Sequence, residues 1–148
     1  MRVLLTGHRG YIGSVLSSLL VERGYDVIGY DTGYYRGCEL YPWDPGGSEI
    51  QKDIRDASAR DLDGIEAIIH LAALSNDPLG ELDSRLTDQI NRDATIRLAR
   101  LAKEAGVKRF VYASSQSMYG VSDTDAELDE ETSEKNPVTA YARTKLEA

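Results

Sequence analysis

Residues 7–13, Gly-His-Arg-Gly-Tyr-Ile-Gly, form a glycine-rich turn between two segments with different hydrophobic patterns. The apolar run 3–5 before the turn indicates a short buried strand. After the turn, apolar side chains recur at helical spacing and predict one face of an amphipathic helix: Ile12, Val15, Leu16, Leu19 and Leu20. Gly24 is suited to end this helix, and residues 26–30 have the pattern of a second strand. Residues 1–31 therefore predict a strand–helix–strand unit.

The three glycines of the turn, Gly7, Gly10 and Gly13, are spaced as G-x-x-G-x-x-G. Glycines at a strand–helix junction let the backbone turn tightly, approach a pyrophosphate and pack the helix on the sheet. Free N–H groups at the start of the helix, near Tyr11 and Ile12, are then placed to bind phosphates. The turn in this context predicts a Rossmann-type dinucleotide site.

Asp31 ends the second predicted strand, 18 residues after Gly13. An acid about 20 residues beyond the turn is the expected partner of the adenosine ribose hydroxyls. Its charge repels a 2′-phosphate, so the sequence favours NAD over NADP. Arg9 and Arg36 carry the opposite charge and weaken that preference.

Further strands are expected at 49–52, 67–71 and 109–113, and helices at 57–62, at 86–105 and from Pro137 onward. Strands that alternate with helices predict an α/β fold with a doubly wound parallel sheet. The 148 residues suffice for one domain. Two loops, 32–48 and 122–136, interrupt the pattern, and Trp43 in the first is interpreted as a packing anchor.

Composition narrows the class of protein. A net charge of −8 argues against nucleic acid and anionic membranes as partners. Cys38 is the single cysteine, which excludes an intrachain disulfide and fits a reducing cytoplasm. We expect no signal peptide and no spanning helix, because no apolar run approaches ~18 residues. His8 and His70 lie in unrelated contexts, so no metal site is predicted, and His70 is interpreted as a hydrogen-bonded structural histidine.

Tyr141 and Lys145 stand at i and i+4, which places both side chains on one face of a helix. A tyrosine pKa of about 10 is too high for a base at neutral pH, and a nearby ammonium favours the phenolate. Such pairs are also common on ordinary helix surfaces, so this pair gains weight from following the fifth strand. The serines of segment 114–117 lie directly after that strand, where open α/β sheets bind ligands.

Together these motifs resemble the extended short-chain dehydrogenase/reductase family of nucleotide-sugar epimerases and dehydratases. The resemblance rests on TGHRGYIG at 6–13, Asp31, DIR at 53–55, HLAA at 70–73, Asn91 with Thr95, SSQSMYG at 114–120 and YARTK at 141–145. It implies that NAD is contacted by Asp53 and Ile54 at the adenine and lined by Leu71, Ala72 and Ala73, with Asn91 supporting that region. It also implies a catalytic set of Ser115, Tyr141 and Lys145, with Lys145 also bonding the nicotinamide ribose.

The chemistry implied by the resemblance is removal of a sugar hydroxyl proton by Tyr141 with hydride transfer to NAD, then reduction from the other face. Relatives resembling 4,6-dehydratases carry an Asp-Glu pair where this chain has Gln116 and Ser117, so epimerase chemistry is favoured. The HRG of the turn also resembles NADP-using GDP-fucose synthases, against which Asp31 argues.

Family members are longer than this chain. Residues 1–148 are therefore interpreted as an incomplete NAD-binding domain, inactive alone, whose full-length form is expected to be a homodimer with a nucleotide-sugar lobe. Two alternatives stay open. One is a non-catalytic NAD-binding module, and the other is a dehydrogenase or reductase of a non-sugar alcohol.

Overall fold

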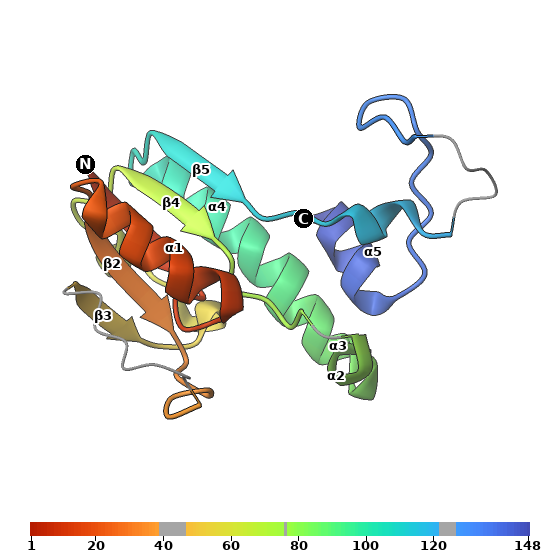
Figure 1. Ribbon diagram of the computed structural model, residues 1–148, viewed down its shortest axis with the longest axis horizontal. Helices are drawn as coiled ribbons and strands as arrows, with labels where there is room; N and C mark the ends of the chain where they lie inside the picture. The colour runs from red at the N-terminus through yellow and green to blue at the C-terminus, as the bar shows by residue number, and fades with distance from the viewer. Residues whose placement is uncertain (39–46, 76, 122–126) are drawn as a thin grey trace.

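The computed structural model describes residues 1–38, 47–75, 77–121 and 127–148. Its centre is a five-stranded parallel sheet in the order β3-β2-β1-β4-β5 (Figure 1). The strands are β1 (Arg2–Thr6), β2 (Asp26–Asp31), β3 (Ser48–Gln51), β4 (Ala67–His70) and β5 (Arg109–Tyr112). The order reverses direction at β1, which is the switch point of a doubly wound fold. The predicted fold class is confirmed.

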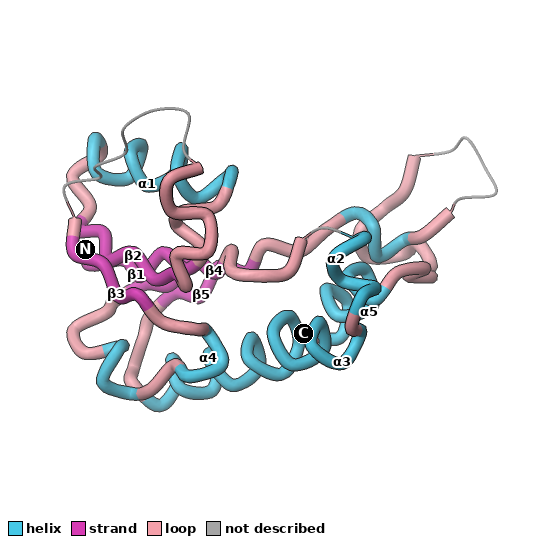
Figure 2. Tube along the Cα trace, turned by 90° about the horizontal axis from the view of Figure 1, so that it is seen from below, coloured by secondary structure: helices cyan, strands magenta, loops and turns pink. Residues whose placement is uncertain are grey.

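Helices cover both faces of the sheet. Figure 2 shows α1 (Tyr11–Glu22) on one side of the strands and α4 (Ala94–Glu104) on the other. Three further helices gather beyond the carboxyl ends of the strands: α2 (Asp77–Leu82), α3 (Ser84–Thr87) and α5 (Ala140–Glu147). This arrangement leaves the carboxyl edge of the sheet facing α5.

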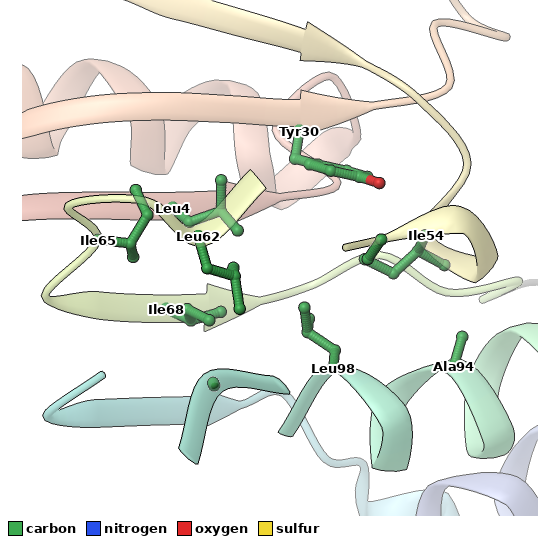
Figure 3. Close-up of a cluster of buried hydrophobic side chains, with 10 residues drawn as sticks. Leu4, Tyr30, Ile54, Leu62, Ile65, Ile68, Ala94 and Leu98 are labelled. Atoms are coloured by element: carbon green, nitrogen blue, oxygen red, sulfur yellow. The ribbon is translucent and has the colours of Figure 1, made fainter. Parts of the chain in front are cut away.

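The hydrophobic core lies between the sheet and α4 (Figure 3). The sheet contributes Leu4 and Ile68, both fully buried, and α4 contributes Leu98. Tyr30 is buried beside them and its hydroxyl donates to the Asp53 carbonyl at 3.0 Å. Burial of this many apolar side chains fixes α4 against one sheet face.

The apolar face of α1 that the sequence predicts is present, and it is largely exposed. Ile12 and Val15 are each 62% exposed and Leu19 is 39% exposed, whereas Gly13 and Ser17 are buried. The helix packs on the sheet through these two small residues, so its apolar stripe does not face the sheet. The stripe borders a shallow groove of about 360 Å³.

Two predicted helices have other forms. The predicted helix 57–62 is a 3-10 turn at Ala59–Leu62, preceded by another at Ile54–Asp56, because the extended Ser58 separates the two turns. The predicted helix 86–105 consists of α3, a π-helical segment Asp88–Asp93 and α4. Helix α2 was not predicted.

The last helix begins at Ala140, three residues later than the predicted start at Pro137. Thr139 is extended and its side chain accepts from the Ala142 N–H at 3.1 Å, which makes it the N-cap. The Glu81 carboxylate accepts from the Ala140 N–H at 2.7 Å. These two acceptors satisfy the first donors of α5 and set its start.

Gly24 and Gly106 have positive φ just after α1 and α4, as predicted for glycines that end helices. Trp43 lies outside the described residues. Among those described, no helix combines the length and apolarity needed to cross a bilayer. In the same part of the chain, no three His, Cys, Asp or Glu side chains are grouped as a metal site would require.

Candidate functional site

The glycine turn leaves no room for side chains at two positions. Gly7 has φ +70°, and a Cβ there would lie 2.8 Å from the Ala72 backbone nitrogen. A Cβ at Gly13 would overlap the Gly7 carbonyl oxygen. The described side chains provide no cap for α1, whose N-cap is Gly10. Its first N–H groups therefore remain available at the cavity described next, which fits a phosphate-bearing ligand.

A cavity of about 860 Å³ opens at the carboxyl ends of the strands, between the glycine turn and α5. Most of the predicted site residues line it: Gly7, Gly10, Tyr11, Ile12, Gly13, Asp31, Asp53, Ile54, Leu71, Ala72, Ala73, Tyr141 and Lys145. The structure thus brings together residues separated by more than a hundred positions in the sequence. The cavity is large enough for a dinucleotide.

Asp31 is held at the edge of this cavity by two backbone donors. The Gly33 N–H donates to one carboxylate oxygen at 2.8 Å and the Arg9 N–H to the other at 3.2 Å. The acid is therefore fixed where β2 ends and α1 approaches, which is the place expected for a ribose-binding carboxylate.

The Asp53 carboxylate is occupied by Arg55, whose side chain donates to both oxygens at 3.0 and 2.8 Å. This hydrogen bonding lowers the pKa of Asp53 below its usual value. The backbone N–H of Arg55 adds a third bond at 2.9 Å. Asp53 thus shapes the turn that presents Ile54 to the cavity.

Tyr141 and Lys145, which the sequence places on one face of a helix, both line the cavity. Lys145 is 5% exposed, and its Nζ donates to the Ala113 carbonyl at 2.7 Å. Nζ lies 4.6 Å from the ring centre of Tyr112 and 5.7 Å from that of Tyr141. Burial lowers the pKa of Lys145 to about 8. A desolvated cation beside a phenol suits proton transfer.

Ser115 and Asn91 do not line the cavity. Ser115 Oγ accepts from the Ser117 N–H at 3.2 Å and shares a 2.8 Å hydrogen bond with Ser117 Oγ. Asn91 is buried, accepts from the Leu74 N–H at 2.8 Å and donates to the Leu74 carbonyl at 3.0 Å. It therefore holds the loop after β4 from behind.

His70 is hydrogen-bonded on both ring nitrogens, as its interpretation as a structural histidine expects. Nδ1 lies 2.7 Å from Thr6 Oγ1 and Nε2 lies 2.8 Å from Thr95 Oγ1. Thr95 donates its proton to the Asn91 carbonyl, so Nε2 must carry a proton and donate to Thr95. Thr6 Oγ1 accepts from the Leu71 and Ala72 N–H groups and donates to Nδ1. A neutral His70 thus links β1, β4 and α4 under the cavity.

The sequence analysis missed part of the cavity lining: Tyr30, Thr32, Tyr34, Tyr35, Lys52, Leu74, Ser75, Ile90 and Ala113. Tyr34 and Tyr35 are 76% and 61% exposed. Exposed aromatic residues directly after the strand-end acid were a usable signal for a ligand-facing loop.

Comparison with protein families gives a match to the NAD dependent epimerase/dehydratase family over residues 3–148. The chain is 36% identical over 126 residues to a 3 beta-hydroxysteroid dehydrogenase/Delta 5-->4-isomerase of Mycobacterium tuberculosis, covering 79% of this chain and 32% of that protein. It is 33% identical over 156 residues to a UDP-glucose 4-epimerase of Mycolicibacterium smegmatis, covering 99% of this chain and 48% of that protein. The chain thus spans less than half the length of these relatives.

Two solved structures are similar over 99% of this chain. One is TunA, an NAD-dependent NDP-hexosamine 5,6-dehydratase, with a TM-score of 0.86 and 28% identity over 47% of that chain. The other is MoeE5 in complex with UDP-glucose and NAD, with a TM-score of 0.82 and 34% identity over 46% of that chain.

Proposed function

The chain belongs to the NAD-dependent epimerase/dehydratase family, and from this premise we propose that it forms the NAD-binding, proton-transferring part of a nucleotide-sugar epimerase. The observation that carries the proposal is the shared cavity. Tyr141 and Lys145 line the same space as the glycine turn and Asp31. Relatives that are UDP-glucose 4-epimerases support the substrate class.

In this proposal NAD is held along the carboxyl edge of the sheet. The N–H groups at the start of α1 bind the pyrophosphate, and Asp31 accepts from the adenosine ribose hydroxyls. Ile54 contacts the adenine, and Ala72 lines the middle of the cofactor. The space closed to side chains at Gly7 and Gly13 supports a backbone approach to phosphate.

Tyr141 acts as the base toward a sugar hydroxyl. The Lys145 ammonium, kept dry against Ala113 and the Tyr112 ring, favours the phenolate electrostatically and bonds the nicotinamide ribose. NAD, when bound, supplies a hydride acceptor and donor at this end of the cavity. The chain's own task is therefore to take and return one proton at the Tyr141 oxygen.

Ser115 orients the substrate oxygen. Its Oγ can accept from both the N–H and the hydroxyl of Ser117, and its own proton, which it gives to Gln116 Oε1 over a long 3.5 Å contact, turns to the substrate in this proposal. Such a donor stabilises charge that develops on the substrate oxygen.

Epimerisation is proposed over 4,6-dehydration because Gln116 and Ser117 carry no acid or base in the turn after Ser115. A second candidate is oxidation of a non-sugar alcohol, supported by the similarity to 3 beta-hydroxysteroid dehydrogenases. Both use the same Tyr141 and Lys145 pair, so the substrate distinguishes them.

The test supplies the complete gene product with NAD and either UDP-glucose or a 3β-hydroxysteroid. The account predicts formation of the C4 epimer of UDP-glucose, reduced by roughly a hundredfold or more in Tyr141→Phe with unchanged NAD affinity. Tyr25→Phe, remote from the cavity, is the matched control and keeps full activity. Retained turnover in Tyr141→Phe contradicts the proposed base, and turnover of the steroid alone favours the second candidate.

A further inference from the structure

A cluster of four charged side chains lies beside the glycine turn, next to β2 and β3. Glu49 of β3 accepts from the Arg9 side chain through both carboxylate oxygens, at 2.8 and 2.6 Å. It also accepts from Arg36 at 3.0 Å. The backbone N–H of Arg9 donates to Asp31 at 3.2 Å. Arg9 therefore connects Glu49 to the acid at the cavity edge.

The strand register explains why Glu49 reaches the turn. Glu49 pairs with Gly29, and Gln51, two residues on, pairs with Asp31. Residues two apart on a strand point to the same face, so Glu49 and Asp31 face the glycine turn together. The His8 ring fills the space above Gly29, where a Cβ would lie 2.6 Å from the ring. Glu49, the one acid of β3, thus faces Arg9 of the turn.

The contacts with the two arginines keep Glu49 ionised. The hydrogen bond from Arg9 is the main reason that the pKa of Glu49 falls to about 2. The side chains of Arg9 and Glu49 are 13% and 24% exposed, so water screens this bidentate pair only in part. Both guanidinium groups therefore share the Glu49 carboxylate, and Asp31, held by the backbone N–H groups of Arg9 and Gly33, adds a second negative charge beside them.

We propose that Glu49 is a second determinant of cofactor choice, excluding NADP by engaging the two arginines that would otherwise bind a 2′-phosphate. The inference rests on the placement of the adenosine ribose at Asp31 proposed above. A 2′-phosphate at that place meets a cluster whose positive and negative charges balance. The cluster therefore provides no net attraction to offset the free energy of desolvating the phosphate. Asp31 binds the ribose of NAD, and Glu49 engages Arg9 and Arg36 so that they do not bind the added phosphate.

The test is titration of NAD and NADP into the complete gene product by calorimetry. Glu49→Gln keeps the size of the side chain and removes its charge. We expect the ratio of the NADP to the NAD dissociation constant to fall by about tenfold, the worth of one charge-assisted contact. Glu66→Gln is the matched control, because Glu66 pairs with the N-terminus away from the cavity, and its ratio stays that of the unaltered protein.

An unchanged ratio in Glu49→Gln overturns the inference. The Arg9→Gln/Glu49→Gln double variant removes one cation together with the acid. The gain in NADP affinity seen in Glu49→Gln must therefore largely disappear in the double variant, and a full gain in the double variant also overturns the inference. If Glu49→Gln does not fold, Glu49→Ala replaces it. This variant also removes the charge that engages the two arginines, so the ratio must again fall.

The Asp31→Asn variant separates this inference from the proposed function. Weaker NAD binding in Asp31→Asn together with an unchanged ratio in Glu49→Gln rejects the role of Glu49 alone. Unchanged NAD binding in Asp31→Asn rejects the placement of the ribose, and with it the premise of the inference.

Discussion

His70 shows at the residue scale how a titratable group can be kept neutral for a structural purpose. Its ring is fully buried and hydrogen-bonded to Thr6 and Thr95. Burial, with the charge of Lys145 as a smaller cause, lowers the pKa of His70 to about 3. Protonation would break the acceptor role of Nδ1 and release the backbone after β4.

This depressed pKa predicts a loss of stability in mild acid. The unfolded chain binds a proton near pH 6.5 and the folded chain does not, so the contribution is complete above that pH and falls toward pH 3. We expect the free energy of unfolding to drop by about 2 kcal/mol between pH 7 and 5 through this group. In His70→Gln, whose side chain does not titrate, this pH-dependent drop should be missing from the free energy of unfolding measured with urea. Identical pH profiles for the variant and the unaltered protein would contradict the neutral state assigned to His70.

Helix α5 is the element on which the proposed chemistry depends, because it carries both Tyr141 and Lys145. Its start is fixed by Thr139 and by Glu81 of α2. Ion pairs of its Arg143 with Asp88 at 2.8 Å and its Glu147 with Arg92 at 3.0 Å add little each, since all are partly exposed.

The N-cap should therefore dominate the local stability of α5. Thr139→Ala removes the acceptor for the Ala142 N–H, and we expect a loss of about 1 kcal/mol in the free energy of unfolding by urea. Thr132→Ala, in an exposed turn, is the matched control and should change it by less than about 0.5 kcal/mol. Equal losses in the two variants would show that Thr139 is not the effective cap.

Elements were predictable from the sequence where local pattern decides them. The glycine turn, its flanking strands and the Tyr141 and Lys145 face needed only spacing within a few residues. The start of α5 was misplaced because Glu81, from a helix that the sequence analysis did not predict, provides one of its acceptors. Glu49 was missed because only strand pairing brings it to Arg9.

At the scale of the whole molecule, the two helix-covered faces of the sheet are unequal. The α4 side holds the tightly buried cluster around Leu98, whereas the apolar stripe of α1 stays largely exposed. Helical periodicity predicted an apolar face for α1 correctly, but which side packs depends on Gly13 and Ser17 meeting the sheet. Exposed apolar stripes of this kind mark contact surfaces in many proteins.

Because α4 is packed more tightly than the apolar stripe of α1, we expect substitutions in the two helices to lower the free energy of unfolding by different amounts. Leu98→Ala empties a fully packed site and should cost about 2–5 kcal/mol in the free energy of unfolding. Val15→Ser changes a side chain that is 62% exposed and should cost less than about 1 kcal/mol. Denaturant unfolding measures both, and a Val15→Ser loss as large as that of Leu98→Ala would contradict the described packing of α1.

The most direct test of the central claim is calorimetric titration of NAD into the complete gene product and two glycine variants. Gly13→Val places a side chain against the Gly7 carbonyl, whereas Gly80→Ala adds a methyl group with ordinary contacts away from the cavity. The account predicts saturable NAD binding by the unaltered protein and by Gly80→Ala, and its loss in a folded Gly13→Val. Equal NAD affinity in all three proteins, or no binding by the unaltered protein, would contradict it.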